Sequence, residues 1–579
     1  MKCLLRVDMK TKGVFREKWP REYRGLGGRG LIARLALSEI DPLCCPLSAD
    51  NRLVITPGVL AGGVVPSAER LSLGGKSPLT GGIKESNSGG ITGLALGRLG
   101  VGAIVVEGKP PAGELSVLVI GATGAELLPG DSLRGKVTSE VTALLQKKYG
   151  NEAAVLCIGP AGESQALAAA ALNTDLTGRS CRVNGRGGMG ALMGSKGIKA
   201  VVILPGTYPA RQVKDRRRWE KALVTYRRIV TGSVQCKSYR NLGTMQTMDL
   251  ANNLGCLPTR NYRRGYFGPA AQMGGEPFRQ LILTRGGEGR PTAACVPGCL
   301  ICCSNIFPDS QGRELAAPLN YQPVASLGPN LSLANLDEIA SLYRLCNDLG
   351  IDVVEAGASL ALLMEKGKIP WGDARAIARV LKEAAFRKGP FAWVVDGVVV
   401  TADVLGVKRV PAVKGQAFPA YDPRALKGVG VTFATSPQGA DHTAGHTLRA
   451  KINHHRPQGQ ARESLKAQIS AAMCDTLGTC LFLMPCLGQR IDILGEILGA
   501  LEGAPAQLAD LEKLGRQVLG WEREFNRRAG FSPKDDRLPD YCRVEPLYPA
   551  GTVFDVPESE LARVTRAMDE ILSVPPQGE

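Results

Sequence analysis

Short apolar runs, separated by glycine and proline, are the dominant pattern in residues 1 to about 205. The clearest runs are 52–63, 102–108, 153–162 and 199–206. Runs of this length between turn residues are typical of buried β-strands. One stretch, 139–150, has helical spacing instead, with Ser139 as a candidate N-cap and Gly150 as a stop. The pattern therefore predicts a β-rich N-terminal region with one clear helix.

From about residue 206 the apolar positions recur at the spacing of amphipathic helices. We expect Asp373 to cap the fourth of these helices and Gly389 to follow its end. The predicted helices are 208–232, 335–350, 354–367, 372–389, 505–530 and 558–572. The whole pattern predicts an α+β fold with a β-rich N-terminal domain over 1–205. Two mainly α-helical domains would follow, over 206–412 and 413–579.

Length and charge narrow the class of protein. A chain of 579 residues is too long for one hydrophobic core, so several domains are expected. The net charge of +17 favours an acidic partner, such as an electron carrier or a phosphate-rich cofactor. We find no nucleic-acid-binding motif and expect no nucleic acid partner. The first residues contain no apolar signal segment, and no run of eighteen apolar residues occurs, so we expect a cytoplasmic protein without a membrane span.

Four of the sixteen cysteines fall in the nine residues CVPGCLICC, 295–303. Cys295, Cys299 and Cys303 have a spacing suited to an iron–sulfur cluster, with Cys302 as a further candidate. Tetrahedral zinc and a redox pair of Cys299 with Cys302 are the alternatives. The scattered cysteines are expected to be small buried hydrophobic residues: Cys3, Cys44, Cys45, Cys157, Cys236, Cys256 and Cys542.

Two glycine-rich loops, 70–90 and 178–200, carry arginine and lysine among their glycines. Close backbone N–H groups and cations together favour a large phosphorylated ligand. A short motif also recurs, as NDLGID at 347–352 and DTLGTC at 475–480. An aspartate in this motif can accept two N–H bonds from an aminopyrimidinone ring, although two helix C-caps would have the same pattern. Cys480 ends the second copy and is a candidate fourth cluster ligand.

In this order the motifs resemble the aldehyde ferredoxin oxidoreductase family, the tungsten enzymes with a bis-pterin cofactor. The resemblance spans almost the whole chain, through 24–37, 86–90, 184–200, 421–442 and 535–547. It implies a β-domain that forms a base for the cofactor and two helical domains that close over it. It also implies a tungsten (or molybdenum) bis-pyranopterin, magnesium bridging the pterin phosphates, and a 4Fe-4S cluster. Such an enzyme oxidises an aldehyde substrate, and its electrons pass to an acidic ferredoxin or a small iron–sulfur subunit.

The resemblance also assigns roles to individual residues. Arg70, Lys76, Asn87 and Gly89 match the first pterin loop, with Asn87 near the magnesium, and Arg182, Val183, Gly185 and Arg186 match the second. Asn347, Ile351 and Asp352 match the first Asp-x-x-Gly motif, and Asp475, Thr479 and Leu481 match the second. Cys295, Cys299, Cys303 and Cys480 match the cluster ligands, and His442 matches a histidine expected to move protons beside the metal.

The chain departs from the family pattern at several of these positions. The cysteine triplet is C-x3-C-x3-C instead of C-x2-C-x3-C, and Asn347 replaces an aspartate. Gln322 falls where the family carries a glutamate beside the substrate, and an amide cannot take a proton. SLYR, 341–344, replaces the E-x-x-H pair that binds a bridging iron, so a homodimer, if one forms, would lack that iron. Two alternatives stay open: the active-site subunit of an aromatic acyl-CoA reductase, and a non-enzymatic, zinc-stabilised binding protein.

Overall fold

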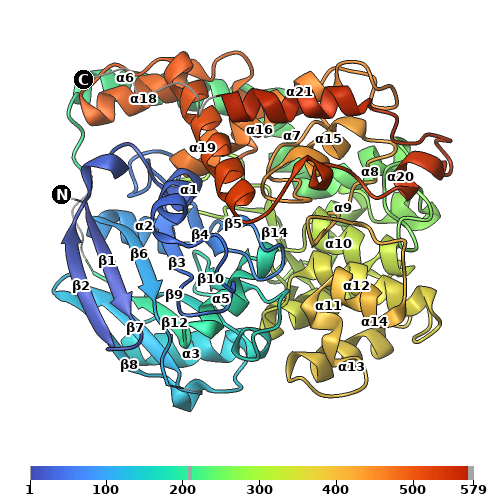
Figure 1. Ribbon diagram of the computed structural model, residues 1–579, viewed down its shortest axis with the longest axis horizontal. Coiled ribbons are helices and arrows are strands. Elements are labelled where there is room, and N and C mark those ends of the chain that lie inside the picture. The colour runs from blue at the N-terminus through green and yellow to red at the C-terminus, as the bar shows by residue number, and fades with distance from the viewer. Residues whose placement is uncertain (1, 112, 207–210, 571–579) are drawn as a thin grey trace.

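The structure is a computed structural model that describes residues 2–111, 113–206 and 211–570. Its first sheet has the strand order β2-β1-β6-β3-β4-β5. The strands are β1 (Cys3–Asp8), β2 (Gly13–Lys18), β3 (Leu53–Pro57), β4 (Leu71–Lys76), β5 (Ile83–Ser88) and β6 (Val101–Glu107). Helix α1 (Gly28–Glu39) precedes β3, and α2 (Thr92–Leu99) precedes β6. Figure 1 shows this sheet in blue on one side of the molecule.

The second sheet has the order β11-β10-β9-β12-β7-β8. Its strands are β7 (Ser116–Gly121), β8 (Gly124–Pro129), β9 (Ala154–Ile158), β10 (Ala171–Thr174), β11 (Ser180–Asn184) and β12 (Ile198–Ile203). Helices α3 (Thr138–Tyr149), α4 (Pro160–Glu163) and α5 (Met189–Ser195) connect them. Apolar side chains from both sheets share one buried cluster, so the two sheets pack together.

The two sheets have the same topology. In each, the first strand pairs antiparallel with the second and parallel with the sixth, β1 with β6 and β7 with β12. The third strand pairs antiparallel with the sixth and with the fourth in both. Helices α1 and α3 occupy equivalent connections, and so do α2 and α5. The N-terminal region is therefore a structural duplication, although its sequence contains no recognisable repeat.

The predicted strands are confirmed as β3, β6, β9 and β12. The predicted helix is α3, and Gly150 is its C-cap. Ser139, however, is not the N-cap. The helix begins at Thr138, and the capping position is held by Val137, which makes no side-chain cap bond. Thr138 instead donates through its hydroxyl to the carbonyl of Asn347, so a tertiary contact decides where this helix begins.

The rest of the chain is mainly helical, as predicted, which confirms the α+β class. Its longer helices are α6 (Arg216–Gly232), α7 (Val234–Leu242), α8 (Gln246–Asn253), α9 (Gly275–Arg285), α11 (Leu336–Leu349), α12 (Val353–Glu365), α13 (Ala374–Ala385), α14 (Val398–Leu405), α15 (Lys427–Thr435), α16 (Gln460–Leu477), α18 (Asp492–Glu502), α19 (Leu508–Arg528) and α21 (Glu558–Asp569). Short helices are α10 (Tyr321–Leu327), α17 (Leu483–Leu487) and α20 (Tyr541–Val544). The small sheets are β13 (Arg290–Ala293), β14 (Ser304–Pro308) and β15 (Glu314–Ala316), and β16 (Ala412–Val413) with β17 (Gln416–Ala417).

The predicted helix ends are right only in part. Asp373 caps α13 by accepting the N–H of Ala376, as expected. Gly389 does not follow the end of that helix, because α13 stops at Ala385 and the chain turns at Arg387, which has a φ of +57°. The ends of two predicted helices, at 208–210 and 571–572, lie outside the described residues.

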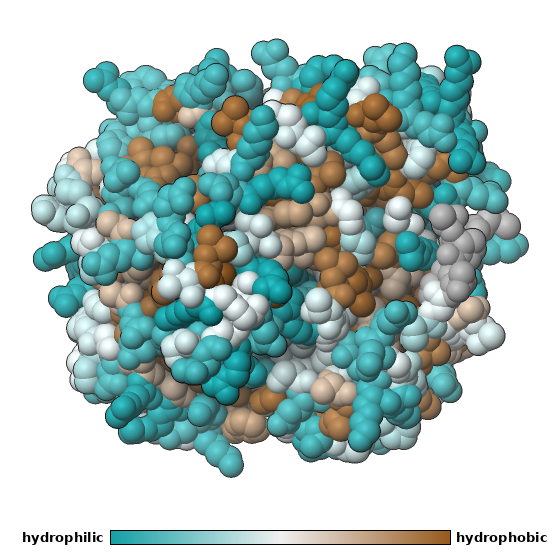
Figure 2. All heavy atoms as spheres, turned by 180° about the vertical axis from the view of Figure 1, so that it is seen from behind, coloured by the Kyte–Doolittle hydropathy of each residue, from teal (hydrophilic) through white to brown (hydrophobic). Residues whose placement is uncertain are grey.

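The two helical parts of the chain share a continuous core. The ring of Tyr262 meets that of Phe418 at 5.7 Å, and Phe418 stacks on Phe433 at 5.4 Å. The division at 412 therefore remains a prediction. Cys45 is exposed, contrary to expectation, whereas the other six scattered cysteines are buried. Apolar side chains reach the rear face of the molecule in groups separated by hydrophilic ones (Figure 2). Among the described residues, no helix has both the length and the apolar composition needed to cross a bilayer.

Candidate functional site

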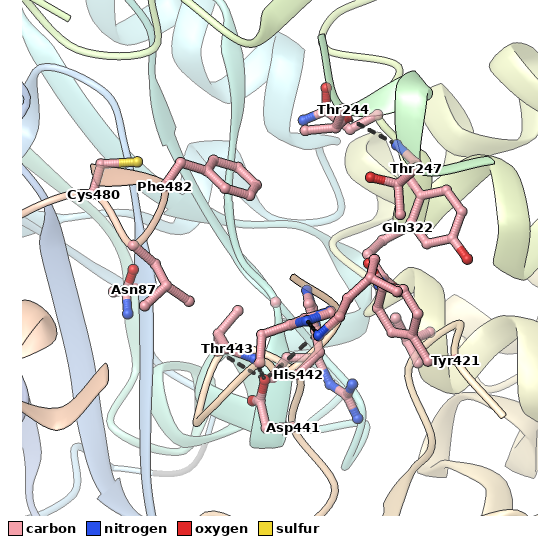
Figure 3. A pocket seen from close by; sticks show the side chains of 18 of the residues that line it. Asn87, Thr244, Thr247, Gln322, Tyr421, Asp441, His442, Thr443, Cys480 and Phe482 are labelled. Carbon is pink, nitrogen blue, oxygen red and sulfur yellow. Dashed lines mark hydrogen bonds and ion pairs between the residues drawn. The ribbon is translucent and has the colours of Figure 1, made fainter. Parts of the chain in front are cut away.

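A cavity of about 640 Å³ lies between the sheet strands and the helical part of the chain. Its wall contains thirteen of the residues singled out from the sequence: Arg70, Asn87, Val183, Gly185, Arg186, Gln322, Asn347, Ile351, Asp352, His442, Asp475, Cys480 and Leu481. Figure 3 shows Asn87 and Cys480 on one side of the cavity, with Gln322 and Tyr421 on the other and His442 between them. The remaining candidates, Lys76, Gly89, Arg182, Thr479, Cys295, Cys299 and Cys303, are not in the wall.

Both copies of the repeated motif are the C-terminal ends of helices. Gly350 is the C-cap of α11 and Gly478 that of α16, with φ values of +72° and +78° that favour glycine. The C-cap interpretation is therefore confirmed, yet both helix ends also line the cavity. Each docks on an equivalent strand: the N–H of Arg70 donates to the carbonyl of Gly478 at 3.2 Å, and that of Ala170 to Gly350 at 2.8 Å. The duplication thus presents two similar helix ends to one cavity.

Asp475, near the end of α16, lies in a buried polar network. Its Oδ1 accepts from Asn87 Nδ2 at 3.1 Å, and its Oδ2 is 3.5 Å from Arg29 Nη1. Arg70 in turn donates to the carbonyl of Asn87 at 3.3 Å. Burial raises the pKa of the Asp475 carboxyl to about 6, against the opposing effect of Arg29 and Arg70. A ligand that donates N–H groups would stabilise the charged carboxylate here.

The side of the cavity near the end of α11 differs from the side near the end of α16. Asp352 caps α12 by accepting the N–H of Val354 at 2.9 Å, and its Oδ2 is 3.1 Å from Arg186 Nε. Arg186 also donates to the carbonyl of Ala417 at 2.8 Å, but its buried Nη1 has no partner among the described residues. A buried guanidinium nitrogen without a partner costs free energy, so it favours an anionic group in this cavity.

The cysteine segments are tied together through one residue, Ser67. Its carbonyl accepts the N–H of Cys480 at 3.0 Å, and its hydroxyl accepts the N–H of Leu300 at 2.9 Å. Cys299, Cys303 and Cys480 belong to one buried cluster of side chains. The structure therefore places the remote cysteine beside the 295–303 segment.

Gly89 and Arg182 lie beside this segment rather than in the cavity wall. A Cβ on Gly89 would meet the carbonyl oxygen of Cys295 at 2.9 Å, so only glycine fits there. Arg182 donates to Ser304 at 2.7 Å and is 3.5 Å from the carbonyl of Ala294. Both residues thus support the cysteine loop from the side of the sheet.

Cys302 is turned toward its own loop. Its thiol donates to the carbonyl of Cys299 at 3.2 Å, and its N–H donates to the sulfur of Cys299 at 3.3 Å. No three His, Cys, Asp or Glu side chains in the described part of the chain converge closely enough for a single metal ion. Tetrahedral zinc needs four donors about 2.0–2.3 Å from one point, whereas a cluster of several irons holds its thiolates further apart.

His442 is a weak base in this environment. Burial lowers the pKa of its imidazole to about 4, although Asp441 opposes the shift with an oxygen 3.7 Å from Nδ1. The ring is therefore neutral near pH 7 and can accept a proton. Gln322 accepts the N–H of Ala420 at 2.9 Å through Oε1, while its buried Nε2 has no partner among the described residues.

Other residues of the cavity escaped the sequence analysis. His446, which no sequence motif marks, lines the cavity with its ring 4.6 Å from Tyr421. Burial and the nearby Asp475 raise the pKa of Glu85 to about 8. Glu85 could have been found, since it lies two positions before Asn87 on β5 and so shares its face.

Two lysines show how a strand directs its side chains. Lys76, expected in the first pterin loop, instead directs its amine to the carbonyl of Pro42 and lies outside the wall. Lys84, absent from the sequence analysis, forms a buried ion pair of 2.6 Å with Asp441. The cation next to the His442 segment is therefore Lys84.

Comparison with known proteins gives a consistent result. Residues 4–205 match the family model "Aldehyde ferredoxin oxidoreductase, N-terminal domain", and 221–571 match "Aldehyde ferredoxin oxidoreductase, domains 2 & 3". The chain is 31% identical to the tungsten-containing aldehyde ferredoxin oxidoreductase of Pyrococcus furiosus, over 94% of this chain and 91% of that protein. It is 32% identical to the protein of the same name from Thermococcus kodakarensis, with the same coverage.

Among solved structures, the chain resembles the active site complex BamBC of benzoyl coenzyme A reductase in complex with 1,5-dienoyl-CoA. The TM-score is 0.78, with 18% sequence identity over 100% of this chain and 99% of that one. At this identity the likeness shows the fold alone.

Proposed function

The chain belongs to the aldehyde ferredoxin oxidoreductase family, and from this premise we propose that it oxidises an aldehyde to the carboxylic acid. The reaction would take place at a tungsten (or molybdenum) bis-pyranopterin centre, and the electrons would leave through a 4Fe-4S cluster. One observation carries the proposal: two equivalent helix ends face a single cavity, and Cys480 beside one of them meets the 295–303 cysteine loop.

The residues of the cavity fit such a cofactor. Asp475 and Asp352 offer carboxylate oxygens to ring N–H groups, and Arg70 and Arg186 offer guanidinium groups to phosphates. The partnerless Nη1 of Arg186 supports the binding of an anionic group there. When bound, the metal centre supplies a Lewis acid and a two-electron acceptor.

The chain supplies the proton chemistry. The neutral imidazole of His442 would take the proton lost as water adds to the aldehyde carbon. Asp441, held by its 2.6 Å ion pair with Lys84, keeps a negative charge 3.7 Å from this ring and stabilises the imidazolium that forms. Gln322 cannot take a proton, so its amide would orient substrate through the partnerless Nε2.

The test is aldehyde-dependent reduction of a viologen dye by anaerobically purified, metal-replete enzyme. A panel of aliphatic and aromatic aldehydes should include at least one that gives stoichiometric carboxylate. Metal analysis of the same sample should find iron with tungsten or molybdenum. If none of the aldehydes causes reduction of the dye, the proposal is contradicted. Zinc as the sole metal would favour the non-enzymatic alternative instead.

A second candidate is an active-site subunit that reduces the ring of an aromatic acyl-CoA. This candidate is favoured by Gln322, which stands where the family carries a glutamate beside an aldehyde substrate. It also suits the fold that the chain shares with the benzoyl coenzyme A reductase complex. Consumption of an aromatic acyl-CoA in the presence of a strong reductant, together with inactivity toward every aldehyde, would decide for this candidate.

A further inference from the structure

Helices α6 and α7 carry a concentration of positive charge. Residues 216–240 contain eight basic side chains and one acidic side chain, Glu220. Glu220 is paired with Arg216 at 2.9 Å. The other exposed cations form no ion pair within the described residues: Arg217, Arg218, Lys221, Arg227, Arg228, Lys237 and Arg240. This segment therefore supplies net charge of +7 out of the +17 of the whole chain.

The inner face of the same helices covers the cysteine site. Leu223, Tyr226 and Val230 of α6 belong to the buried cluster that contains Cys299, Cys303 and Cys480. The hydroxyl of Tyr226 donates to the carbonyl of Pro66 at 2.9 Å, next to the Ser67 that ties the cysteine segments. The inner face of α6 and the thiols therefore belong to the same buried cluster, while the cations of α6 face outward.

The cysteine loop itself reaches the surface beside α7. Gly298 is exposed, and Leu300 and Cys302 are partly exposed. The thiol of Cys236 on α7 donates to the carbonyl of Leu300 at 3.3 Å. The loop therefore connects the cysteine site to solvent beside α7.

Two valines stand among the exposed cations. Val224 on α6 is 68% exposed, and Val234 at the start of α7 is 76% exposed. Protein interfaces commonly combine apolar side chains with a charged rim, and like charges left unpaired favour a partner of opposite sign. We define the α6–α7 surface as Val224, Arg228, Val234 and Lys237 together with the other exposed cations of 216–240.

We propose that the α6–α7 surface docks a small acidic iron–sulfur protein that removes electrons one at a time through the 298–302 loop. The inference rests on the proposed function and adds the place of electron exit. In the balanced reaction, RCHO + H₂O gives RCOO⁻ + 3 H⁺ + 2 e⁻. Each carrier takes one electron, so two carriers dock in turn for every aldehyde oxidised. The carrier's acidic face would meet the arginines and lysines, and its cluster would lie above the loop.

The experiment reverses charge on this surface without touching the cavity. The variant is Arg228→Glu/Lys237→Glu, which changes two exposed residues on α6 and α7. The matched control is Arg375→Glu/Arg379→Glu on α13. Both residues are exposed and form no ion pair within the described residues, and the change of charge is the same. Each enzyme is assayed with an aldehyde and two acceptors, a viologen dye and a purified acidic ferredoxin, at low and high salt.

We expect kcat/KM for ferredoxin to fall about tenfold or more at low salt in the α6–α7 variant, with the viologen rate unchanged. High salt should reduce the difference, and the α13 control should behave as the wild type. Unchanged ferredoxin kinetics in the α6–α7 variant would overturn the docking surface while leaving the proposed function intact.

A binding titration of the same ferredoxin decides the case if no aldehyde is oxidised. Wild type and α13 control should bind it in a salt-sensitive manner, and the α6–α7 variant should bind at least about tenfold more weakly. Equal binding by all three proteins would refute the docking surface even where turnover is absent. Failure of aldehyde oxidation alone would refute only the proposed function.

Discussion

Replacement of His442 by asparagine tests the proton chemistry most directly. The Asn side chain preserves polarity and approximate size but cannot accept a proton in the relevant pH range. Burial brings the pKa of the imidazole from 6.5 to about 4, a difference that corresponds to roughly 3 kcal/mol. General base catalysis usually accelerates a reaction by about 10²- to 10⁴-fold, and a base weakened this far should lie near the lower end. We therefore expect kcat/KM to fall about a hundredfold.

The pH dependence supplies a second, independent measure. Since the imidazole loses its function on protonation, kcat/KM of the wild type should fall as the pH drops toward about 4. The Asn variant should be slow at every pH and should lack this acidic limb. The assay is aldehyde-dependent viologen reduction on samples with equal tungsten or molybdenum content.

Unfolding must be distinguished from titration of the base. The folded pKa of His442 lies below the unfolded value, so the folded state binds fewer protons between them. The contribution of His442 to the free energy of unfolding is therefore complete above about pH 6.5. As the pH falls toward 4, the free energy of unfolding decreases by up to about 3 kcal/mol. Circular dichroism across the same range separates this loss from catalysis.

His455→Asn is the control, because His455 lies outside the cavity and bonds the carbonyl of Leu254 at 2.9 Å. It should retain wild-type rates and the acidic limb. An acidic limb that persists in His442→Asn, or full activity of that variant, would refute the assignment of His442 as the base.

Three further predictions concern the cluster, the core and the pocket. Cys302→Ser should retain the iron measured in wild type, whereas Cys299→Ser should lose it. Glu522→Gln should lower the free energy of unfolding by about 3–5 kcal/mol in urea titrations, because it breaks a buried two-pronged pair with Arg29 at 2.8 Å. The double variant Arg29→Met/Glu522→Leu should lose less, and an equal or greater loss would contradict the argument. Gln322→Glu should raise kcat/KM for aldehydes, since it replaces a partnerless amide with a proton acceptor; a decrease at equal metal content would show that the amide is required.

Much of the fold follows from local sequence. Residues 153–158 predict β9 because they form a short apolar run that Gly159 and Pro160 end. The duplication could not be predicted, because it lies in strand order and not in residue identity. Arg70 and Ala170 occupy equivalent places at the start of β4 and β10 and donate equivalent backbone bonds, yet their side chains share nothing.

The site was predicted where a motif carries its own local geometry. Gly350 and Gly478 fix two helix ends, and these bring Asn347 and Asp475 to the cavity. The misses arose where a distant segment decides. The amine of Lys76 donates to the carbonyl of Pro42 and so lies outside the cavity wall. No local sequence pattern predicts that contact. His446 likewise gains its place through packing on Tyr421.

The duplication explains how one cavity can have two chemically different sides. Asp352 and Cys480 hold corresponding places, each two residues after the glycine that ends its helix. Both are held by backbone bonds to equivalent loops, from Asp352 to the carbonyl of Ala168 and from Cys480 to that of Ser67. In one half this place holds a carboxylate that caps a helix and pairs with Arg186, which anchors charge. In the other half it holds a thiol beside the cysteine loop, under the basic helix α6. In the proposed reaction, this thiol on one side of the cavity and not the other is what would direct electrons toward the α6–α7 surface.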